Sequence, residues 1–184
     1  MSQRDSGYAR KERDLYETPE WVTDAVCKHI RLTVNGIIWE PAAGSGKMAK
    51  VLRSTLGGVR ESDISTGVDF LTVSDRCARE HGIAAIVTNP PYDSATEFCA
   101  HALRLMEPVA GVVAMLLRTD FDHAKSRSHL FRDCPAFAKK LVLTKRIVWF
   151  EPEPGAKGKS PSFNHAWFIW DWQHEGAPTL AYGP

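Results

Sequence analysis

Short apolar runs without polar alternation recur along the chain and limit the folds open to it. The clearest runs are residues 37–39, 84–88 and 109–117. Strands of this kind are typical of parallel sheets, because helices cover both of their faces. Apolar residues at helical spacing between the runs, at 94–106 and 122–132, indicate connecting helices. The alternation of strands and helices predicts an α/β fold with a doubly wound, mostly parallel sheet.

The first strand is flanked by further predicted elements. Thr18 and Pro19 are typical of a helix start, with threonine as the N-cap and proline in the first turn, and apolar residues at helical spacing follow. After residues 37–39, a second helix is expected to end at a pair of glycines. Residues 59–63 are then predicted to form a strand that ends at Asp63.

The two ends of the chain differ in character from its middle. Residues 1–13 are polar and charged, and we expect them to form a flexible arm. Residues 141–150 and 165–172 are rich in β-branched and aromatic residues, which favours an antiparallel hairpin. Its tip, residues 151–164, carries prolines, glycines and lysines and is predicted to be a mobile substrate loop. A length of 184 residues favours one domain, residues 14–184, because little chain remains for a second folded module.

The composition excludes several classes of protein. A content of 43% hydrophobic and 24% charged residues is typical of a soluble globular chain and unlike a disordered one. The net charge of +1 lacks the basic excess of many nucleic-acid binders, so such a partner must be recognised by local patches. The four cysteines form no Cys-x-x-Cys pair, so we expect no metal site and a reducing cytoplasmic location. No apolar run approaches the roughly 18 residues of a membrane span.

A glycine turn follows the first strand. The strand ends at Glu40 and continues as Pro-Ala-Ala-Gly-Ser-Gly through Gly46, a turn whose backbone can approach a ligand closely. A phosphate loop is excluded, because that motif needs glycine where Pro41 stands and serine or threonine where Met48 stands. The turn also fits a dinucleotide-binding fingerprint, but a dehydrogenase needs a second domain for its substrate. The alternative interpretation is that these glycines only shape a tight turn.

Two aspartates after the second strand are candidate ligands for a nucleoside. Asp63 ends a predicted strand, where a carboxylate can accept hydrogen bonds from both hydroxyls of a ribose. Asp69 is placed where an acid can accept from an exocyclic amine. As isolated residues, both would be interpreted as solvated loop acids.

The sequence Asn89-Pro90-Pro91-Tyr92 directly follows the run 84–88. Two prolines hold the backbone extended and remove two N–H donors, so the segment presents acceptors with little flexibility. The asparagine amide adds an acceptor, and the tyrosine adds a flat apolar face. This combination predicts a site for a planar amine, whereas a bare Pro-Pro would indicate a turn that leaves the sheet.

Together these motifs resemble the class I S-adenosylmethionine-dependent amino-methyltransferases, and most closely the DNA adenine-N6 methyltransferases. The similarity covers about residues 16–172, and the order of residues 16–19, the glycine turn and Asn-Pro-Pro-Tyr matches the gamma-type arrangement. Glu40 stands where many relatives have aspartate, which keeps the charge. The resemblance implies a Rossmann-like methyltransferase sheet and S-adenosylmethionine as cofactor. The residues it implies for cofactor binding are Tyr16, Thr18, Pro19, Glu40, Pro41, Ala42, Gly44, Gly46, Asp63, Ile64, Asp69, Phe70 and Asn89.

The resemblance also implies the catalytic and substrate-binding residues. Asn89, Pro90, Pro91 and Tyr92 match the catalytic tetrapeptide, in which the asparagine oxygen and the first proline carbonyl accept from the amine and the tyrosine stacks on adenine. Residues 145–150 and 165–168 are similar to a late motif of the target-base pocket. The alternative interpretation of the basic residues in this hairpin is that they are solvated surface residues without a binding role. The expected substrate-binding residues are Tyr92, Lys145, Arg146, Trp149, Phe150, Lys157, Lys159 and His165.

The implied reaction is methyl transfer to the N6 amine of adenine in DNA, either in a duplex with a flipped base or in a single strand. No separate target-recognition domain is evident, so we expect a minimal catalytic core of short or relaxed sequence specificity, acting as a monomer or weak homodimer. Enzymes with the same Asn-Pro-Pro-Tyr motif also transfer the methyl group to adenine in RNA or to a glutamine amide in a protein, and these are the alternative acceptors. A catalytically inactive binding subunit with this fold is a further alternative.

Overall fold

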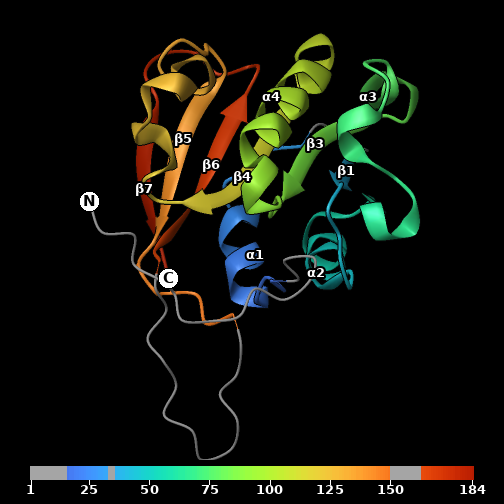
Figure 1. Ribbon diagram of the computed structural model, residues 1–184, viewed down its shortest axis with the longest axis horizontal. Coiled ribbons are helices and arrows are strands. Elements are labelled where there is room, and N and C mark those ends of the chain that lie inside the picture. The colour runs from blue at the N-terminus through green and yellow to red at the C-terminus, as the bar shows by residue number, and fades with distance from the viewer. Residues whose placement is uncertain (1–15, 33–35, 150–162) are drawn as a thin grey trace, which may run out of the picture.

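The structure is a computed structural model that describes residues 16–32, 36–149 and 163–184. Its centre is a seven-stranded sheet in the order β2-β1-β3-β4-β6-β5-β7 (Figure 1). Strand β6 runs antiparallel to both of its neighbours, and every other adjacent pair is parallel. The strands are β1 (Ile37–Glu40), β2 (Val59–Glu61), β3 (Ile83–Thr88), β4 (Val112–Arg118), β5 (Phe137–Leu143), β6 (His165–Asp171) and β7 (Thr179–Gly183).

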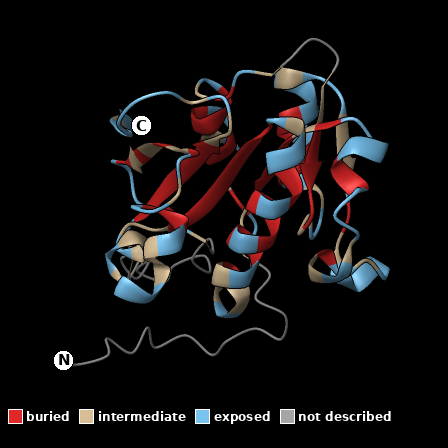
Figure 2. Ribbon diagram, turned by 90° about the horizontal axis from the view of Figure 1, so that it is seen from above, coloured by how far each residue is buried: buried red, intermediate tan, exposed pale blue. Residues whose placement is uncertain are grey.

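Helices cover both faces of the sheet and divide the core into two apolar layers. Helices α1 (Glu20–Cys27) and α2 (Lys47–Leu56) pack on one face, with Leu52 in that layer. Helices α3 (Cys77–Glu80) and α4 (Ala95–Met106) pack on the other, with Phe98 in that layer. Figure 2 shows the strands buried between helices whose outer faces are exposed. The predicted fold class, a mostly parallel doubly wound sheet with a C-terminal antiparallel hairpin, is confirmed.

Several predicted boundaries were wrong. Helix α1 begins at Glu20 with Pro19 rather than Thr18 at its N-cap, and no side chain caps it. Residues 122–132 form no α-helix; they contribute to the 3-10 helices η5 (Phe121–His123) and η6 (Lys125–Leu130). The reason is the polar run 125–129, which offers no apolar stripe for an α-helix to bury.

The C-terminal strands also differ from the prediction. Strand β5 begins at Phe137 and ends at Leu143, so residues 144–149 lie outside the sheet. Phe137 extends the strand because its ring packs on Phe131, with centroids 5.1 Å apart. Strand β7 was not predicted. Its pairing with β5 defines it, and its large apolar side chains, Leu180 and Tyr182, are exposed. The predicted arm, residues 1–13, and most of the predicted loop, residues 151–162, lie outside the described residues.

Candidate cofactor and acceptor site

The sheet topology brings distant parts of the sequence to one edge. Parallel strands β1, β3 and β4 end there, at Glu40, Thr88 and Arg118. Strand β6 is antiparallel and therefore begins at the same edge, with His165 paired opposite Arg118. The Asn-Pro-Pro-Tyr segment leaves β3 at this edge, which is where open α/β sheets bind their ligands.

The glycine turn between β1 and α2 has the backbone expected for close approach to a ligand. Gly44 and Gly46 have φ of +53° and +80°, in the left-handed region that favours glycine. A Cβ atom on Gly46 would lie 3.2 Å from Glu61 Oε2. The N–H of Gly44 donates to Asp63 Oδ2 at 2.9 Å, which fixes the turn against the segment that follows β2.

The two predicted aspartates each cap a short 3-10 helix. Asp63 Oδ1 accepts from the N–H and the hydroxyl of Ser65, at 2.8 and 2.6 Å. Asp69 is exposed, and its Oδ1 accepts from the N–H of Leu71 at 3.0 Å. Both carboxylates are therefore held in ordered loops that follow β2, and the Asp63 carboxylate contacts the glycine turn directly.

Ile64 and Phe70 follow these aspartates and have opposite environments. Ile64 is 71% exposed, which is unusual for a large apolar side chain next to a binding loop. Phe70 is 2% exposed and packs edge-on against Trp39, with centroids 5.2 Å apart. Ile64 thus offers an apolar surface to a ligand, while Phe70 supports the loop from the core.

Glu40 is a buried carboxyl group at the end of β1. Its Oε1 accepts from the hydroxyl of Thr88 at 2.7 Å, and its Oε2 is enclosed without a hydrogen-bond partner in the described part of the chain. Burial raises the pKa of Glu40 to about 8, the Thr88 hydrogen bond opposes this shift, and the charges of Asp63 and Glu61 add to it. Thr88 was not predicted as a site residue, although its position directly before Asn89 was a usable signal.

Asn89 is held in one orientation by its amide nitrogen. Its Nδ2 donates to the carbonyl oxygen of Tyr16 at 3.2 Å, across 73 residues of sequence. Its Oδ1 is enclosed and has no donor among the described residues. Pro90 is buried and Pro91 is exposed, and the Pro91 carbonyl accepts from the N–H of Ser94 to begin the 3-10 helix Tyr92–Ser94. The motif therefore presents an unsatisfied acceptor on a fixed backbone.

Four aromatic rings at the end of this motif contact one another in a closed ring. We call Tyr16, Tyr92, Trp149 and His165 the aromatic box. Successive centroids are 5.8 Å apart for Tyr16 and Tyr92, 6.2 Å for Tyr92 and His165, 5.2 Å for His165 and Trp149, and 5.5 Å for Trp149 and Tyr16. The rings come from the N-terminal segment, the motif, the segment after β5 and the start of β6. The box supplies flat apolar faces for a planar ligand.

His165 fixes the position of Tyr92 within the box. The Tyr92 hydroxyl lies 3.0 Å from His165 Nε2. Burial, assisted by the charge of Arg118, lowers the pKa of His165 to about 4, while Asp120 opposes the shift. The imidazole is therefore neutral at physiological pH, so its Nε2 can accept from the tyrosine hydroxyl.

The remaining predicted site residues differ in burial and in what they contact. Thr18 and Pro41 are buried, Ala42 is half-buried, and Arg146 is exposed. The Lys145 ammonium lies over the Trp21 ring, 5.1 Å from its centroid, rather than in the aromatic box. Phe150, Lys157 and Lys159 lie outside the described residues. None of the helices in the described ranges has the length and apolar character needed to cross a membrane.

The residues at this edge fit S-adenosylmethionine. The left-handed glycine turn gives backbone access, Asp63 and Asp69 offer carboxylates for hydroxyl and amine donors, and Ile64 offers an apolar surface. Glu40, which directly precedes the turn, adds an enclosed carboxyl oxygen, Oε2, that has no hydrogen-bond partner among the described residues.

Comparisons with known proteins identify the fold. No protein-family model matches this sequence, and a comparison with curated proteins gives no significant match. Among solved structures, a type I restriction-modification system methyltransferase subunit from Streptococcus thermophilus is 12% identical with a TM-score of 0.58, over 86% of this chain and 45% of that chain. A protein from Listeria monocytogenes assigned to the class I S-adenosylmethionine-dependent methyltransferases is 12% identical with a TM-score of 0.55, over 90% and 64% of the two chains.

A third similar structure is a dimethyladenosine transferase from Plasmodium falciparum, which is 14% identical with a TM-score of 0.50, over 85% of this chain and 62% of that chain. The chain thus spans about half to two thirds of the length of these three proteins. At these identities the similarity defines the fold, which is that of the class I methyltransferases.

Proposed function

We propose that this chain is an S-adenosylmethionine-dependent methyltransferase that acts on the exocyclic N6 amine of adenine in DNA. The observation that carries the proposal is the Asn89 amide, whose Nδ2 is anchored on Tyr16 while Oδ1 is buried without a donor among the described residues. A buried acceptor without a donor is costly, so the site favours a ligand that supplies an N–H group. An exocyclic amine is such a donor.

Cofactor binding is assigned to the loops around the glycine turn. Glu40, the turn through Gly46, Asp63, Ile64 and Asp69 are the residues that would hold S-adenosylmethionine. When bound, S-adenosylmethionine supplies a methyl group that its sulfonium centre already activates. The work left to the chain is mainly to position the acceptor.

Asn89 and Pro90 act on the acceptor amine. The Asn89 oxygen and the Pro90 carbonyl accept its two N–H groups, which draws the nitrogen lone pair out of conjugation with the ring. The proton leaves the amine after methylation, so no general base is required beforehand. His165, whose pKa is lowered to about 4, is assigned to holding Tyr92 rather than to proton transfer.

The aromatic box supports adenine as the planar group. Tyr92 supplies a stacking face beside Asn89, and Tyr16 and Trp149 line the same space. Flipping a base out of a duplex costs a few kcal/mol. Stacking on an aromatic side chain contributes roughly 1–3 kcal/mol per base, which offsets much of that cost.

The choice between DNA and RNA rests on the proteins of similar fold. Similarity in fold to the restriction-modification methyltransferase subunit favours DNA, whereas similarity to the dimethyladenosine transferase favours adenine in another context. RNA is therefore the second candidate substrate. Both acceptors require the same contacts from Asn89, Pro90 and Tyr92.

A transfer assay with labelled cofactor tests the acceptor directly. The full chain is incubated with methyl-labelled S-adenosylmethionine and, in parallel, with duplex DNA, single-stranded DNA, RNA and protein, and the products are digested to identify the modified unit. We expect N6-methyladenine in DNA. N6-methyladenine confined to RNA would replace the substrate, methylglutamine would replace the acceptor class, and cofactor binding without any transfer would indicate a binding subunit.

Replacement of Asn89 tests the role of its acceptor oxygen. We expect Asn89→Ala to lower kcat by about 100-fold or more, since losing one preorganised polar contact at a reacting centre has effects of that size. The control is Gln173→Ala, which removes an amide that donates to Ala110 at the opposite edge of the sheet. Both variants are checked for folding by thermal unfolding. An Asn89→Ala protein that transfers methyl groups at the parent rate would contradict the assignment.

A further inference from the structure

A cavity lies at the opposite edge of the sheet, away from the glycine turn and Asn89. Its volume is about 270 Å³. Val112 at the start of β4 and Asp171 at the end of antiparallel β6 both line it, and they are paired in the sheet. His29 and Arg31 reach it from the segment that follows α1. Because β4 ends at the site edge, this cavity is separate from the candidate site.

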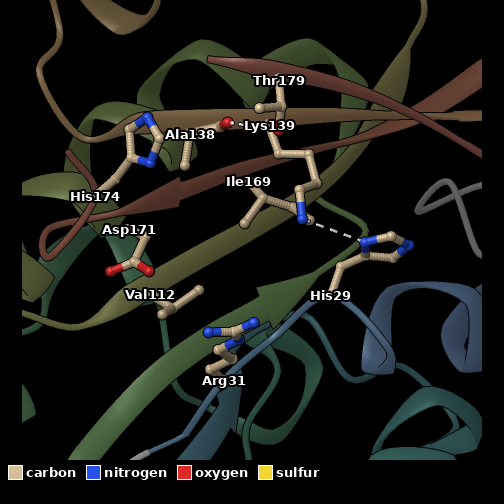
Figure 3. A pocket seen from close by; sticks show the side chains of 9 residues that line it. All are labelled: His29, Arg31, Val112, Ala138, Lys139, Ile169, Asp171, His174 and Thr179. Carbon is tan, nitrogen blue, oxygen red and sulfur yellow. Dashed lines mark hydrogen bonds between the residues drawn. The ribbon is translucent and has the colours of Figure 1, made fainter. Parts of the chain in front are cut away.

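Basic side chains dominate the walls of this cavity, which we call the basic cavity. Figure 3 shows Arg31 and Lys139 reaching toward its middle from opposite sides, with His29 on one flank and His174 on the other. Val112 and Ile169 form part of an apolar floor. The described residues hold no group of three His, Cys, Asp or Glu side chains arranged for a metal ion.

The two cations of the basic cavity, Arg31 and Lys139, are not paired with a carboxylate in the part of the chain that the structure describes. Lys139 Nζ lies 3.3 Å from His29 Nδ1, so the ammonium donates to a neutral imidazole rather than to a carboxylate. Burial and the charges of Lys139 and Lys28 lower the pKa of His29, in keeping with that neutral state. Within the described ranges, Arg31 and Lys139 form no ion pair with a carboxylate.

The one carboxylate in the wall is engaged locally. Asp171 Oδ1 accepts from the N–H of Gln173 at 2.9 Å, within the turn that follows β6. The N–H of His174 donates to the carbonyl of Asp171 at 2.9 Å, which places the His174 ring in the wall. His174 Nε2 is enclosed and has no hydrogen-bond partner among the described residues. An enclosed ring nitrogen of this kind favours a ligand that completes its hydrogen bonding.

We propose that the basic cavity binds a small dianion of the phosphate class, either inorganic phosphate or the terminal phosphate of a small phosphorylated molecule. Arg31 offers a planar fork of donors that matches two phosphate oxygens, and Lys139 offers a compact charge. His174 offers a ring nitrogen to a third oxygen. The small volume, with an apolar floor, suits a small molecule better than the continuous backbone of a nucleic acid.

Histidine ring resonances give a readout that does not depend on methyl transfer. The full chain is titrated with sodium phosphate and, separately, with glycerol phosphate, at about pH 7.5 where ordinary imidazoles are mostly neutral. Sodium chloride keeps the ionic strength constant, because screening alone changes weak electrostatic binding. We expect saturable shifts of the His29 and His174 signals with a Kd of about 1 mM or tighter. Shifts with both ligands indicate a site for the phosphate group itself, and shifts with glycerol phosphate alone indicate a small phosphorylated molecule.

Variants of the two cations locate the binding. We expect Lys139→Met and Arg31→Met each to raise the Kd by about tenfold, as for the loss of one charge-assisted contact. Lys50→Met is the matched control, since Lys50 is exposed on α2. Arg31 lies outside the sheet, so its variant keeps the test valid if Lys139→Met fails to fold.

Three results would overturn the proposal. They are no saturable shift with either ligand, binding that both variants leave unchanged, and shifts produced by a single-stranded oligonucleotide without a terminal phosphate but not by the two small ligands. The last result would assign the cavity to a nucleic-acid backbone. The assay needs no methyl acceptor, so its outcome is independent of the function proposed for the other edge.

Discussion

At the scale of single residues, an enclosed oxygen atom without a hydrogen-bond partner in the described part of the chain lies next to the end of each of the strands β1 and β3. One is Asn89 Oδ1, directly after β3, and the other is Glu40 Oε2, at the end of β1; neither has a partner among the described residues. Thr88 links the two residues, because it directly precedes Asn89 and its hydroxyl donates to Glu40 Oε1. Enclosed polar atoms without partners are uncommon in folded proteins, so these two atoms support a ligand site at this edge.

Glu40 makes the stability of the chain depend on pH. Its pKa is raised to about 8 in the folded protein, whereas in the unfolded chain the same carboxyl group has its ordinary pKa of about 4.5. Between these two pH values the folded state therefore binds more protons than the unfolded state. The free energy of unfolding therefore falls as pH rises from about 4.5 to about 8 and levels off above that range. The full loss is on the order of 5 kcal/mol.

Glu40→Gln isolates this effect, because glutamine does not titrate. We expect the wild-type protein to lose stability relative to Glu40→Gln between pH values of about 5 and 8, in urea unfolding at a series of pH values. The difference between the two proteins is the measured quantity, since His165 and other groups contribute equally to both. A constant difference across this pH range would contradict the raised pKa of Glu40.

Two roles are proposed for Tyr92, stacking on the base and hydrogen bonding to His165, and separate substitutions distinguish them. Tyr92→Ala removes the stacking face, and we expect kcat/KM to fall by about tenfold to a hundredfold, as for the loss of one base-aromatic stack. Tyr92→Phe keeps the ring and removes the hydroxyl that contacts His165, so we expect a smaller fall in kcat/KM. Steady-state rates with a DNA acceptor measure both variants. Equal losses in the two variants would assign the effect to the hydroxyl rather than to stacking.

At the scale of elements, the turn between β1 and α2 depends on the left-handed conformation of Gly46. This residue is the N-cap of α2, and the N–H of Lys50 donates to its carbonyl at 2.9 Å. The turn is also held by the donation from Gly44 to Asp63. The elements thus form a preorganised loop, and its shape rather than its side chains determines how closely a ligand approaches the backbone.

Gly46→Ala tests this role of the turn. The φ of +80° makes alanine strained by roughly 1–2 kcal/mol, and its Cβ atom also lies close to Glu61 Oε2. We expect the affinity for S-adenosylmethionine, measured by calorimetry, to fall by about tenfold or more, since tenfold corresponds to about 1.4 kcal/mol.

The matched control is Gly82→Ala. Gly82 also has a positive φ, of +63°, but its Cβ atom would meet open space, and it lies before β3 at the other edge of the sheet. This variant should lose stability to a similar extent and keep its cofactor affinity. Equal affinity losses in both variants would mean that strain alone, and not the turn, weakens binding.

At the scale of the whole molecule, two apolar layers on either side of the sheet hold the site edge in place. Helices α1 and α2 cover one layer, and α4 covers the other only in part. Where no α-helix follows β4, aromatic residues fill the layer: Phe168 packs on Phe131, with centroids 5.4 Å apart, and on Phe137 and Trp170. This cluster takes the place of the helix that was predicted over 122–132.

Phe168→Ala tests the contribution of the aromatic cluster to folding. Phe168 is fully buried, so we expect the free energy of unfolding to fall by about 3–5 kcal/mol, the usual cost of replacing a buried phenylalanine with alanine. Leu180→Ala on β7 is the control, because Leu180 is largely exposed and its loss should cost about 0.5 kcal/mol or less. Similar losses in urea unfolding would contradict the importance of the cluster.

Local patterns in the sequence determined much of this protein. Unbroken apolar runs defined the parallel strands, because such strands are buried on both faces, and the glycine turn and Asn-Pro-Pro-Tyr were readable because their backbone conformations depend on glycine and proline. Tertiary structure alone decided which residues share the site. The anchoring of Asn89 on Tyr16, the contact of Tyr92 with His165, and the burial of Glu40 join residues that are far apart in sequence. They depend on strand order and on the reversed direction of β6, which local periodicity does not encode.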